Sequence, residues 1–321
     1  MLQQTRVNTV IPYYAAFLGK YPTVGALAGA DPQEVLKVWE GLGYYARARN
    51  LYKAAVIVDQ RYRGKIPADY RELRALPGVG EYVAAAVASI AFDQPYPVID
   101  GNVKRVLARF AKIEAPVNDS AMADSFKKMA VKFIDAGRPG IYNQALMELG
   151  ALLCTPKNPH CALCPVSACC GALSKGLVSQ YPKRIQKDRI PLYQIVVGVV
   201  LKADKLLITR RKENGLLGGL WEFPGGKVNR DEDPRDACLR EIREEVNLEI
   251  AIEEYLARVK HAYTHFRIEM DVFICRYISG EIILKGPVDF RWISIAEIDR
   301  YPFPKSNHKF FARLKEALQG R

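Results

Sequence analysis

The sequence lacks any apolar run that approaches the roughly 20 residues of a membrane-spanning helix. It also lacks the charged segment and apolar stretch that open a secretory signal peptide, and it has neither internal repeats nor low-complexity segments. These absences exclude helical membrane proteins and predict a cytoplasmic protein, associated with the nucleoid if the source is bacterial. With 49% apolar and 26% charged residues, the 321-residue chain is ordinary for a globular protein and long enough for about two domains.

Acidic residues are too few to balance the basic ones, and the imbalance is uneven along the chain. The net charge is +12: residues 1–180 carry 21 Lys and Arg against 14 Asp and Glu (+7), residues 181–190 add +3, and residues 191–321 carry 22 against 20 (+2). A charge excess often marks only a solvated face, but a basic first half suits a polyanion, and nucleic acid is favoured over a membrane surface.

Periodicity predicts a multidomain chain with two kinds of structure. Apolar residues recur at helical spacing over 1–18, without a cap residue before this first helix, and then over 32–40, 44–63, 69–75, 81–92, 101–112, 119–136 and 141–152. Short β-branched runs follow at 193–201, 205–210, 250–259, 267–278 and 288–292. We therefore expect an all-α domain at 1–173, a basic linker at 174–190 and an α+β domain at 191–321.

A glycine-rich turn separates two of the expected helices, with the sequence Leu76-Pro77-Gly78-Val79-Gly80. Glycine tolerates positive φ angles, and a bare turn before a helix leaves backbone N–H groups free to bind a phosphate. The alternative is an ordinary connection between two helices.

Aromatic and arginine residues alternate at the start of another helix, where Tyr44, Tyr45, Arg47 and Arg49 follow two glycines. The tyrosines could pack in the core. Alternatively, they could stack on nucleic-acid bases beside phosphate contacts from the arginines.

The cysteines are concentrated in one segment, which places five of the seven within 17 residues. Their spacing is Cys154-x6-Cys161-x2-Cys164-x5-Cys170, with Cys169 left over. Without an export signal, a metal is favoured over disulfides. Four thiolates can hold zinc or an iron–sulfur cluster, and the uneven spacing differs from the paired short knuckles of most zinc sites. Buried, unligated cysteines are the remaining alternative.

Three carboxylates, Glu241, Glu244 and Glu245, share one face of an expected helix. They belong to the pattern Gly-x5-Glu-x7-Arg-Glu-Ile-x-Glu-Glu, which starts at residue 226. Clustered carboxylates repel unless a hard cation such as Mg²⁺ joins them. The alternative is a solvated helix on which Arg240 and Arg243 act as counterions.

Together these motifs resemble the MutY-type adenine DNA glycosylases of the helix-hairpin-helix superfamily, which remove adenine mispaired with 8-oxoguanine. The resemblance covers nearly the whole chain and is carried by Met1-Leu2-Gln3-Gln4-Thr5, residues 41–50 and 76–80, Asp100-Gly101-Asn102-Val103-Lys104-Arg105 and the cysteine spacing. It implies an all-α helix-hairpin-helix glycosylase domain with an iron–sulfur loop at 154–170, followed by an α+β Nudix-like domain of the MutT type that reads 8-oxoguanine.

The resemblance also implies catalytic roles. Asp100 would stabilise the oxocarbenium-like transition state, with support from Asn102, although an aspartate before a helix is more often only a cap. Tyr82 stands where lyase relatives carry a lysine nucleophile, which implies monofunctional base removal. A [4Fe–4S] cluster is implied on the four spaced residues Cys154, Cys161, Cys164 and Cys170.

The implied partner is double-stranded DNA with an 8-oxoguanine:adenine or guanine:adenine mispair. A monomer without membrane contact is expected. Three segments would contact the DNA: the hairpin that grips the backbone, a wedge that enters the base stack, and a loop that resembles the family's Phe-Ser-His reader of 8-oxoguanine. Their residues are Pro77, Gly78, Val79 and Gly80, then Gln4, Tyr44 and Arg47, and lastly Tyr263, Thr264 and His265.

Two departures from the family lead to two hypotheses. The family's general acid is a glutamate in a Glu-x-Met-Leu-Gln-Gln-Thr run, which would precede Met1, so a misplaced or truncated start is expected, and the chain as given would bind its lesion but cleave feebly. Second, the Nudix pattern is intact except that Asn247 replaces its last glycine. The domain could therefore retain Mg²⁺-dependent hydrolysis of oxidised nucleoside triphosphates, with Glu241, Glu244 and Glu245 as ligands.

Overall fold

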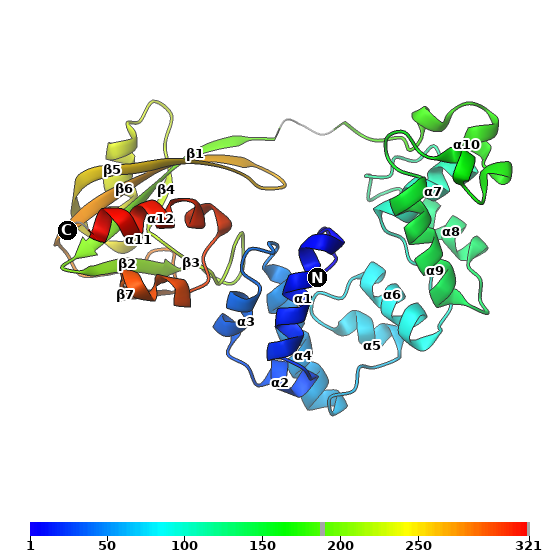
Figure 1. The fold of residues 1–321 in the computed structure, drawn as a ribbon, viewed down its shortest axis with the longest axis horizontal. Coiled ribbons are helices and arrows are strands. Elements are labelled where there is room, and N and C mark those ends of the chain that lie inside the picture. Colours follow the sequence, from blue (N-terminus) through cyan, green and yellow to red (C-terminus); the bar gives the residue numbers. More distant parts are fainter. Residues whose placement is uncertain (187–189, 320–321) are drawn as a thin grey trace. The chain divides into compact units, whose positions relative to one another are not determined.

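The computed structural model describes residues 1–186 and 190–319 (Figure 1). By their contacts, the described residues form two compact units: 1–59 together with 190–319, and 60–186. The start of the chain thus groups with its end, which the order of the motifs does not reveal. The predicted bounds at 1–173, 174–190 and 191–321 stay a prediction, and residues 187–189 of the predicted linker lie outside the described residues. Over the described ranges, no helix is long and apolar enough to span a membrane.

The helical part of the first unit comprises α1 (Val7–Lys20), α2 (Val24–Ala28), α3 (Pro32–Val38) and most of α4 (Ala46–Tyr62). Asp31 caps α3 by accepting a 2.6 Å hydrogen bond from the backbone N–H of Gln33. Trp39 is buried and meets the ring of Phe17 edge to face, 5.9 Å between centroids. A small aromatic core therefore holds these helices together.

The expectation of a helix from the first residue is wrong, because α1 begins at Val7. Gln4 adopts a φ of 57°, which a right-handed helix does not allow. The guanidinium of Arg47 donates to the carbonyls of Met1 and Gln3, each at 2.6 Å. These contacts hold the first residues as a turn.

The second unit is all-α, as the sequence predicts. It contains α5 (Tyr70–Ala75), α6 (Glu81–Phe92), α7 (Gly101–Ala111), α8 (Ala123–Phe133), α9 (Pro139–Glu148) and the short α10 (Gly171–Ser174). The helix expected over 141–152 ends earlier and continues as a π turn over Leu149–Leu153. Gly150 in this turn packs so closely on Asn102 that a Cβ would lie 2.7 Å from the Asn102 Cβ. The turn therefore presses directly on the start of α7.

The rest of the first unit is built on a seven-stranded mixed sheet. Its strands are β1 (Leu192–Lys202), β2 (Lys205–Arg210), β3 (Trp221–Glu222), β4 (Gly225–Lys227), β5 (Glu249–Ala262), β6 (Arg267–Ser279) and β7 (Asp289–Ser294). The order is β3-β2-β1-β6-β5, with β4 paired to β1 and β7 to β2. The β1–β6 pair is parallel and the other pairs are antiparallel. The five longer strands match the predicted runs, whereas β3 and β4 are too short to leave a periodic signal.

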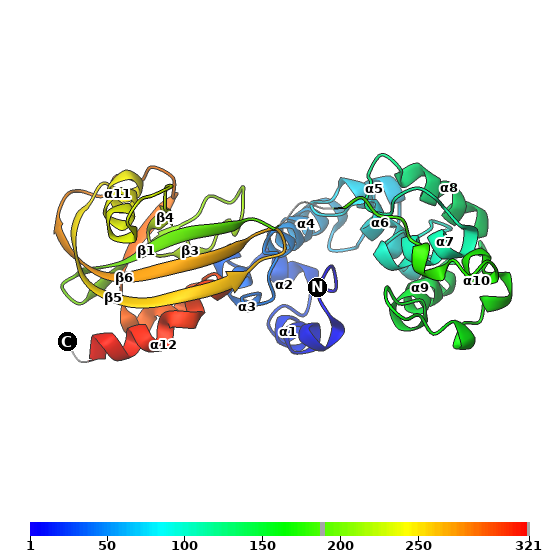
Figure 2. The ribbon, with the colours of Figure 1, turned by 90° about the horizontal axis from the view of Figure 1, so that it is seen from above.

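Two helices cover opposite faces of this sheet, α11 (Pro234–Val246) and α12 (Lys305–Gln319) (Figure 2). Ile242 of α11 joins the buried cluster on one face, and Phe310 of α12 joins the cluster on the other. Asn247 follows α11 with a φ of 60°, in the left-handed region that asparagine tolerates better than most residues. The sheet and these two helices confirm the predicted α+β class.

Candidate active site and cysteine loop

Asp100 lies at the N-terminus of α7, and both of its carboxylate oxygens are engaged. Oδ1 accepts a 2.7 Å hydrogen bond from the backbone N–H of Val103, and Oδ2 accepts one of 3.1 Å from the Asn102 side chain. The carboxylate is therefore both a helix cap and a group held in a fixed orientation by Asn102. The two interpretations of Asp100 are compatible.

Arg105 extends this arrangement toward the cysteine loop. It is 5% exposed, and its guanidinium donates to Asn102 Oδ1 at 2.9 Å, to the Gly150 carbonyl at 2.6 Å and to the Cys154 carbonyl at 2.7 Å. Burial lowers the pKa of Arg105. A continuous path of hydrogen bonds thus runs from Asp100 through Asn102 and Arg105 to Cys154.

Arg105 is not among the site residues predicted from the sequence, although a signal existed. It follows Asn102 by three positions and therefore shares its face of the helix. An arginine on the buried face of an amphipathic helix needs hydrogen-bond acceptors, and here they come from residues 102, 150 and 154.

Tyr82 lies in the first turn of α6, within electrostatic reach of Asp100. Burial, together with the negative charge of Asp100, raises the pKa of Tyr82, so the phenol stays protonated. Its hydroxyl donates to the sulfur of Met147 at 3.8 Å. The structure thus brings Asp100 and Asn102 into contact, while Tyr82 lies near enough for the charge of Asp100 to affect its pKa.

The segment 76–80 forms the turn between α5 and α6. Gly78 has a φ of 75°, as a tight turn requires, but Gly80 has a φ of −78°. Only one of the two glycines therefore adopts the positive φ that glycine tolerates. Gly80 is the N-cap of α6 and supplies no side chain to cap it. Pro77 and Val79 are half-buried beside it. The helix N-terminus is open, as a phosphate contact needs.

The four spaced cysteines, Cys154, Cys161, Cys164 and Cys170, line one small cavity of about 30 Å³. The guanidinium of Arg109, which is buried, lies 3.3 Å from the Cys154 sulfur. Burial and the neighbouring thiols raise the pKa of Cys161. The remaining cysteine of the segment, at position 169, is exposed and does not line the cavity. Across the described residues, no three His, Cys, Asp or Glu side chains are already arranged to hold a metal ion.

The two tyrosines of segment 41–49 differ in burial. Tyr45 is buried and accepts a hydrogen bond from the Gly41 N–H, whereas Tyr44 is 39% exposed. The Arg47 guanidinium lies 5.4 Å from the centroid of the Tyr44 ring and also holds the first residues of the chain. Gln4 is exposed. The side chains of Tyr44 and Gln4 are therefore exposed to solvent.

The three predicted residues of the loop between β5 and β6 differ in their exposure. Tyr263 turns inward, stacks on Phe266 at 4.7 Å between centroids and bonds the Ser306 hydroxyl at 3.0 Å. Thr264 and His265 are exposed. These two side chains are the ones that can meet a partner.

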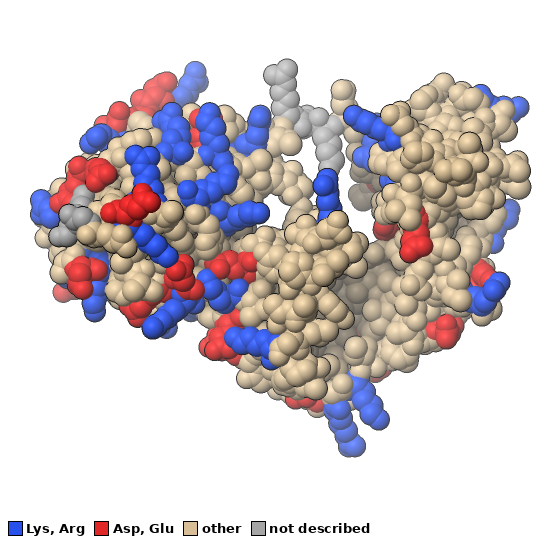
Figure 3. Space-filling model, viewed as in Figure 1, with Lys and Arg blue, Asp and Glu red and all other residues tan. Residues whose placement is uncertain are grey.

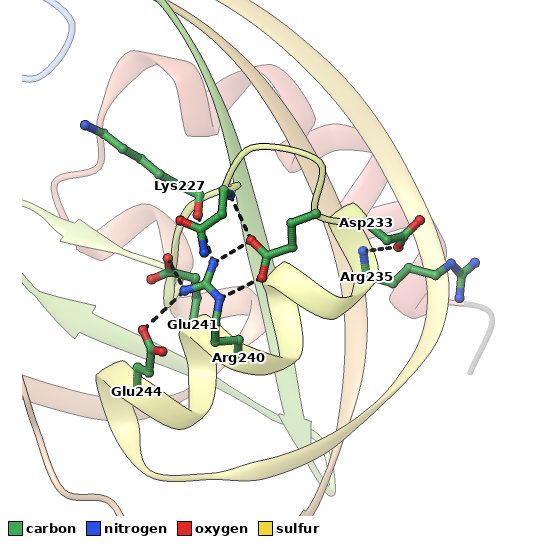
Figure 4. A network of polar contacts seen from close by, with 8 residues as sticks. Lys227, Asp233, Arg235, Arg240, Glu241 and Glu244 are labelled. Carbon is green, nitrogen blue, oxygen red and sulfur yellow. Dashed lines mark hydrogen bonds and ion pairs between the residues drawn. The ribbon is translucent and has the colours of Figure 1, made fainter.

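Arg240 engages two of the three predicted carboxylates of α11 (Figure 4). Arg240 donates to Glu232 at 2.7 Å and 2.8 Å, to Glu241 at 2.8 Å and to Glu244 at 3.2 Å, while Glu245 accepts a 2.9 Å hydrogen bond from the backbone N–H of residue 225. The counterion alternative therefore describes Glu241 and Glu244. Within the described ranges these carboxylates form no group that could hold Mg²⁺ together.

Glu245 and Glu222 line a cavity of about 580 Å³ in the sheet-containing part of the first unit. Glu222, which the sequence did not single out, has a side chain that is 19% exposed and pairs with Arg211 at 2.5 Å. Burial raises the pKa of Glu222. For Glu245, burial and the charge of Glu222 raise the pKa to about 7. Glu245 therefore stays protonated to a higher pH than an ordinary glutamate does.

The raised pKa of Glu245 predicts a pH-dependent stability of the first unit. The ordinary pKa of 4.5 applies after unfolding, so the stabilising effect of protonated Glu245 is complete below that pH and is lost as pH rises through about 7. We expect Glu245→Gln to stabilise the protein at pH 8 by roughly 2 kcal/mol and much less at pH 5. Urea unfolding followed by tryptophan fluorescence measures this, because all three tryptophans, at positions 39, 221 and 292, lie in the first unit. An equal effect at both pH values would contradict the assignment.

Charge does not single out one binding surface on the viewed face of the protein. Figure 3 shows that Lys and Arg side chains gather there over the sheet-containing part, with Asp and Glu side chains among them.

Two family descriptions match the chain in succession: "HhH-GPD superfamily base excision DNA repair protein" over residues 1–130 and "NUDIX domain" over residues 196–313. The chain is 36% identical to an adenine DNA glycosylase of Arabidopsis thaliana, over 89% of this chain and 53% of that protein. It is 33% identical to the adenine DNA glycosylase of Mus musculus, over 100% of this chain and 71% of that protein. A solved thermostable thymine-DNA glycosylase is 28% identical, with a TM-score of 0.50, over 54% of this chain and 80% of that chain. The chain thus spans about half the length of the Arabidopsis relative.

Proposed function

Since this chain belongs to the adenine DNA glycosylases, we propose that it binds duplex DNA and hydrolyses the N-glycosidic bond of an adenine mispaired with 8-oxoguanine or guanine. The observation that carries the proposal is the carboxylate of Asp100, held on both oxygens at the start of α7. The shared name of the relatives favours adenine removal over a lesion-binding protein that does not cleave.

Asp100 supplies negative charge where the reaction creates positive charge. As the bond between the sugar and adenine breaks, its electron pair leaves with the base and the sugar becomes oxocarbenium-like. A fixed carboxylate stabilises this cation more than it stabilises the neutral substrate, and water then completes the hydrolysis. Asn102 keeps the carboxylate in place. Protonation of the departing adenine is assigned to none of the described residues.

Tyr82 supports hydrolysis rather than covalent catalysis. A protonated phenol is a poor nucleophile, and burial and the charge of Asp100 keep the Tyr82 hydroxyl protonated by raising its pKa. Tyr82 can instead contact the extruded nucleotide beside Asp100. The product is then an abasic site in an unbroken strand.

DNA contacts are proposed for three segments of the chain. The open N-terminus of α6 after the 76–80 turn suits a backbone phosphate. Exposed Tyr44 and Gln4 suit the base stack, because base extrusion leaves a gap that a planar side chain fills. Thr264 and His265 offer hydrogen bonds to the edge of 8-oxoguanine.

The single-turnover release of adenine tests this function. We expect release from 8-oxoguanine:adenine and guanine:adenine duplexes, and none from a thymine:adenine duplex of the same sequence. Tight binding to the first duplex without release of base would instead identify a lesion-binding protein. A variant preceded by the glutamate-containing run of the resembled family tests whether such a residue protonates the departing adenine, since general acid catalysis contributes roughly 10²–10⁴-fold.

We propose a [4Fe–4S] cluster on Cys154, Cys161, Cys164 and Cys170, which would pin the loop that contacts Arg105. Two features support it: the four cysteines line one cavity, and Arg109 points a positive charge at the Cys154 sulfur, which favours the anionic state of bound cysteine. When bound, the cluster would supply structural cross-linking of this loop.

The spare cysteine provides a matched test of the cluster. We expect Cys164→Ser to lose the visible absorption and the bound iron of the purified protein, because a ligand is missing. Cys169→Ser should retain both, because Cys169 is exposed outside the cavity. Iron analysis and absorbance spectra measure this, and equal iron content in the two variants would count against the assignment.

Magnesium at α11 has less support. Because Arg240 already pairs with Glu241 and Glu244, the carboxylates fit this guanidinium rather than a shared ion, and the proposed function includes no step through Mg²⁺. Hydrolysis of oxidised nucleoside triphosphates stays a prediction from the sequence. Mg²⁺-dependent pyrophosphate release that is lost in Glu244→Gln would support it.

A further inference from the structure

The first unit joins residues 1–59 to residues 190–319, and α3 supplies several of the contacts between these two segments. Gln33 donates to the Gly219 carbonyl at 3.2 Å and accepts from the Trp221 indole at 3.0 Å. Gly219 has a φ of 78°, and a Cβ there would lie 3.1 Å from Leu36. The junction is therefore closely packed as well as hydrogen-bonded.

Glu40, which follows α3, is an acceptor with several donors at this junction. One oxygen accepts from the Phe303 backbone N–H at 2.7 Å and lies 3.0 Å from His308 Nε2. The other accepts from Lys37 at 2.6 Å, and Lys37 also donates to the Tyr301 carbonyl at 3.1 Å. The Glu40 side chain is 14% exposed. This carboxylate thus holds the start of α12 against the helical segment formed by residues 1–59.

The start of α12 holds in turn the loop between β5 and β6. The Ser306 hydroxyl bonds the Tyr263 hydroxyl at 3.0 Å, and Lys309 donates to the Lys260 carbonyl at 2.6 Å. Thr264 comes directly after Tyr263. The position of Thr264 therefore depends on the contacts of Glu40, through the first turn of α12.

A second contact joins the helical segment to the same loop directly. Four residues after Glu40 comes Tyr44, and the Tyr44 hydroxyl forms a hydrogen bond with the Thr264 hydroxyl. Besides the packing of α3 on residues 219–221, two contacts thus tie Tyr44 to the loop: this hydrogen bond, which DNA must share or replace, and the more buried anchor at Glu40. Of these two contacts, the anchor at Glu40 is the one that can persist unchanged when DNA binds at the exposed side chains.

We propose that Glu40 is a positioning residue for lesion reading, which holds Thr264 beside Tyr44 by clamping the start of α12. The inference rests on the proposed function, because it assumes that Thr264 contacts 8-oxoguanine. A specific contact with the oxidised base requires Thr264 to be placed within a fraction of an ångström, whereas contacts with phosphates tolerate displacement. Loss of the clamp should therefore reduce discrimination rather than general affinity for DNA.

Equilibrium binding of the full chain tests the inference with two duplexes, which carry 8-oxoguanine or guanine opposite a cleavage-resistant adenosine analogue. We expect Glu40→Gln to reduce the preference for 8-oxoguanine by roughly tenfold, as expected for loss of one charge-assisted anchor, with little change toward undamaged DNA. Glu34→Gln is the matched control, because Glu34 lies on α3, is 59% exposed and pairs with Lys20 away from α12. Tryptophan fluorescence verifies that each variant is folded.

A double-mutant cycle separates positioning from general destabilisation. Thr264→Val removes the reading hydroxyl, and if Glu40 acts through Thr264, Glu40→Gln should reduce the preference little further in that background. Fully additive effects, or an unchanged preference in Glu40→Gln alone, would overturn the inference. Absence of any preference in the unaltered protein would instead count against the proposed function.

Discussion

Asp100→Asn is expected to lower the single-turnover rate of adenine release by roughly 10²–10³-fold, with the fold and DNA binding retained. The asparagine carbonyl can still accept the hydrogen bond from the Val103 N–H, so the cap of α7 survives. What disappears is the negative charge beside the developing cation. The substitution therefore isolates the electrostatic role of Asp100 from its structural role.

Asp69→Asn is the control for this change. Asp69 caps α5 in the same way, accepting from the backbone N–H groups of Arg71 and Glu72 at 2.8 Å and 3.0 Å. It should leave the rate of base release unaltered. If both variants slow the reaction equally, Asp100 is only a cap, and the catalytic carboxylate lies elsewhere.

Arg105→Gln is expected to destabilise the second unit by about 3 kcal/mol and to slow base release as well. Glutamine cannot reach all of the acceptors of Arg105, so oxygens of Asn102, Gly150 and Cys154 lose this donor. Without Arg105, Asn102 no longer holds the Asp100 carboxylate firmly, and the cysteine loop is released from α7. Urea unfolding followed by circular dichroism measures the loss of stability, since residues 60–186 contain no tryptophan.

Arg71→Gln is the control for Arg105, because Arg71 is an exposed arginine on a helix of the same unit. It should change stability by less than about 0.5 kcal/mol. The path from Asp100 to the cysteine loop predicts that the two effects of Arg105→Gln appear together. If Arg105→Gln keeps full stability and normal activity, the hydrogen bonds of Arg105 support neither stability nor base release.

Local features of this protein could be predicted from the sequence because local chemistry determines them. Helix α6 spans Glu81–Phe92, as its apolar periodicity predicts, and Asp100 is the cap that an aspartate before a helix is expected to be. The turn at Gly78 follows from the tolerance of glycine for positive φ. In each case, the determining contacts lie within a few residues along the chain.

Features that depend on distant partners could not be predicted in this way. The helix expected from the first residue fails because Arg47, far along the chain, holds those residues in a turn. The acceptors of Arg105 and the donors to Glu40 are likewise distant in sequence.

The most direct test is product analysis on a duplex with one 8-oxoguanine:adenine mispair, with mass spectrometry for the free base and denaturing electrophoresis for the strand. With Asp100 as a fixed carboxylate and Tyr82 as a protonated phenol, free adenine should appear while the strand stays intact until alkali cleaves the abasic site. A strand cut without alkali, or a protein that binds the duplex and releases no adenine, would contradict monofunctional adenine removal.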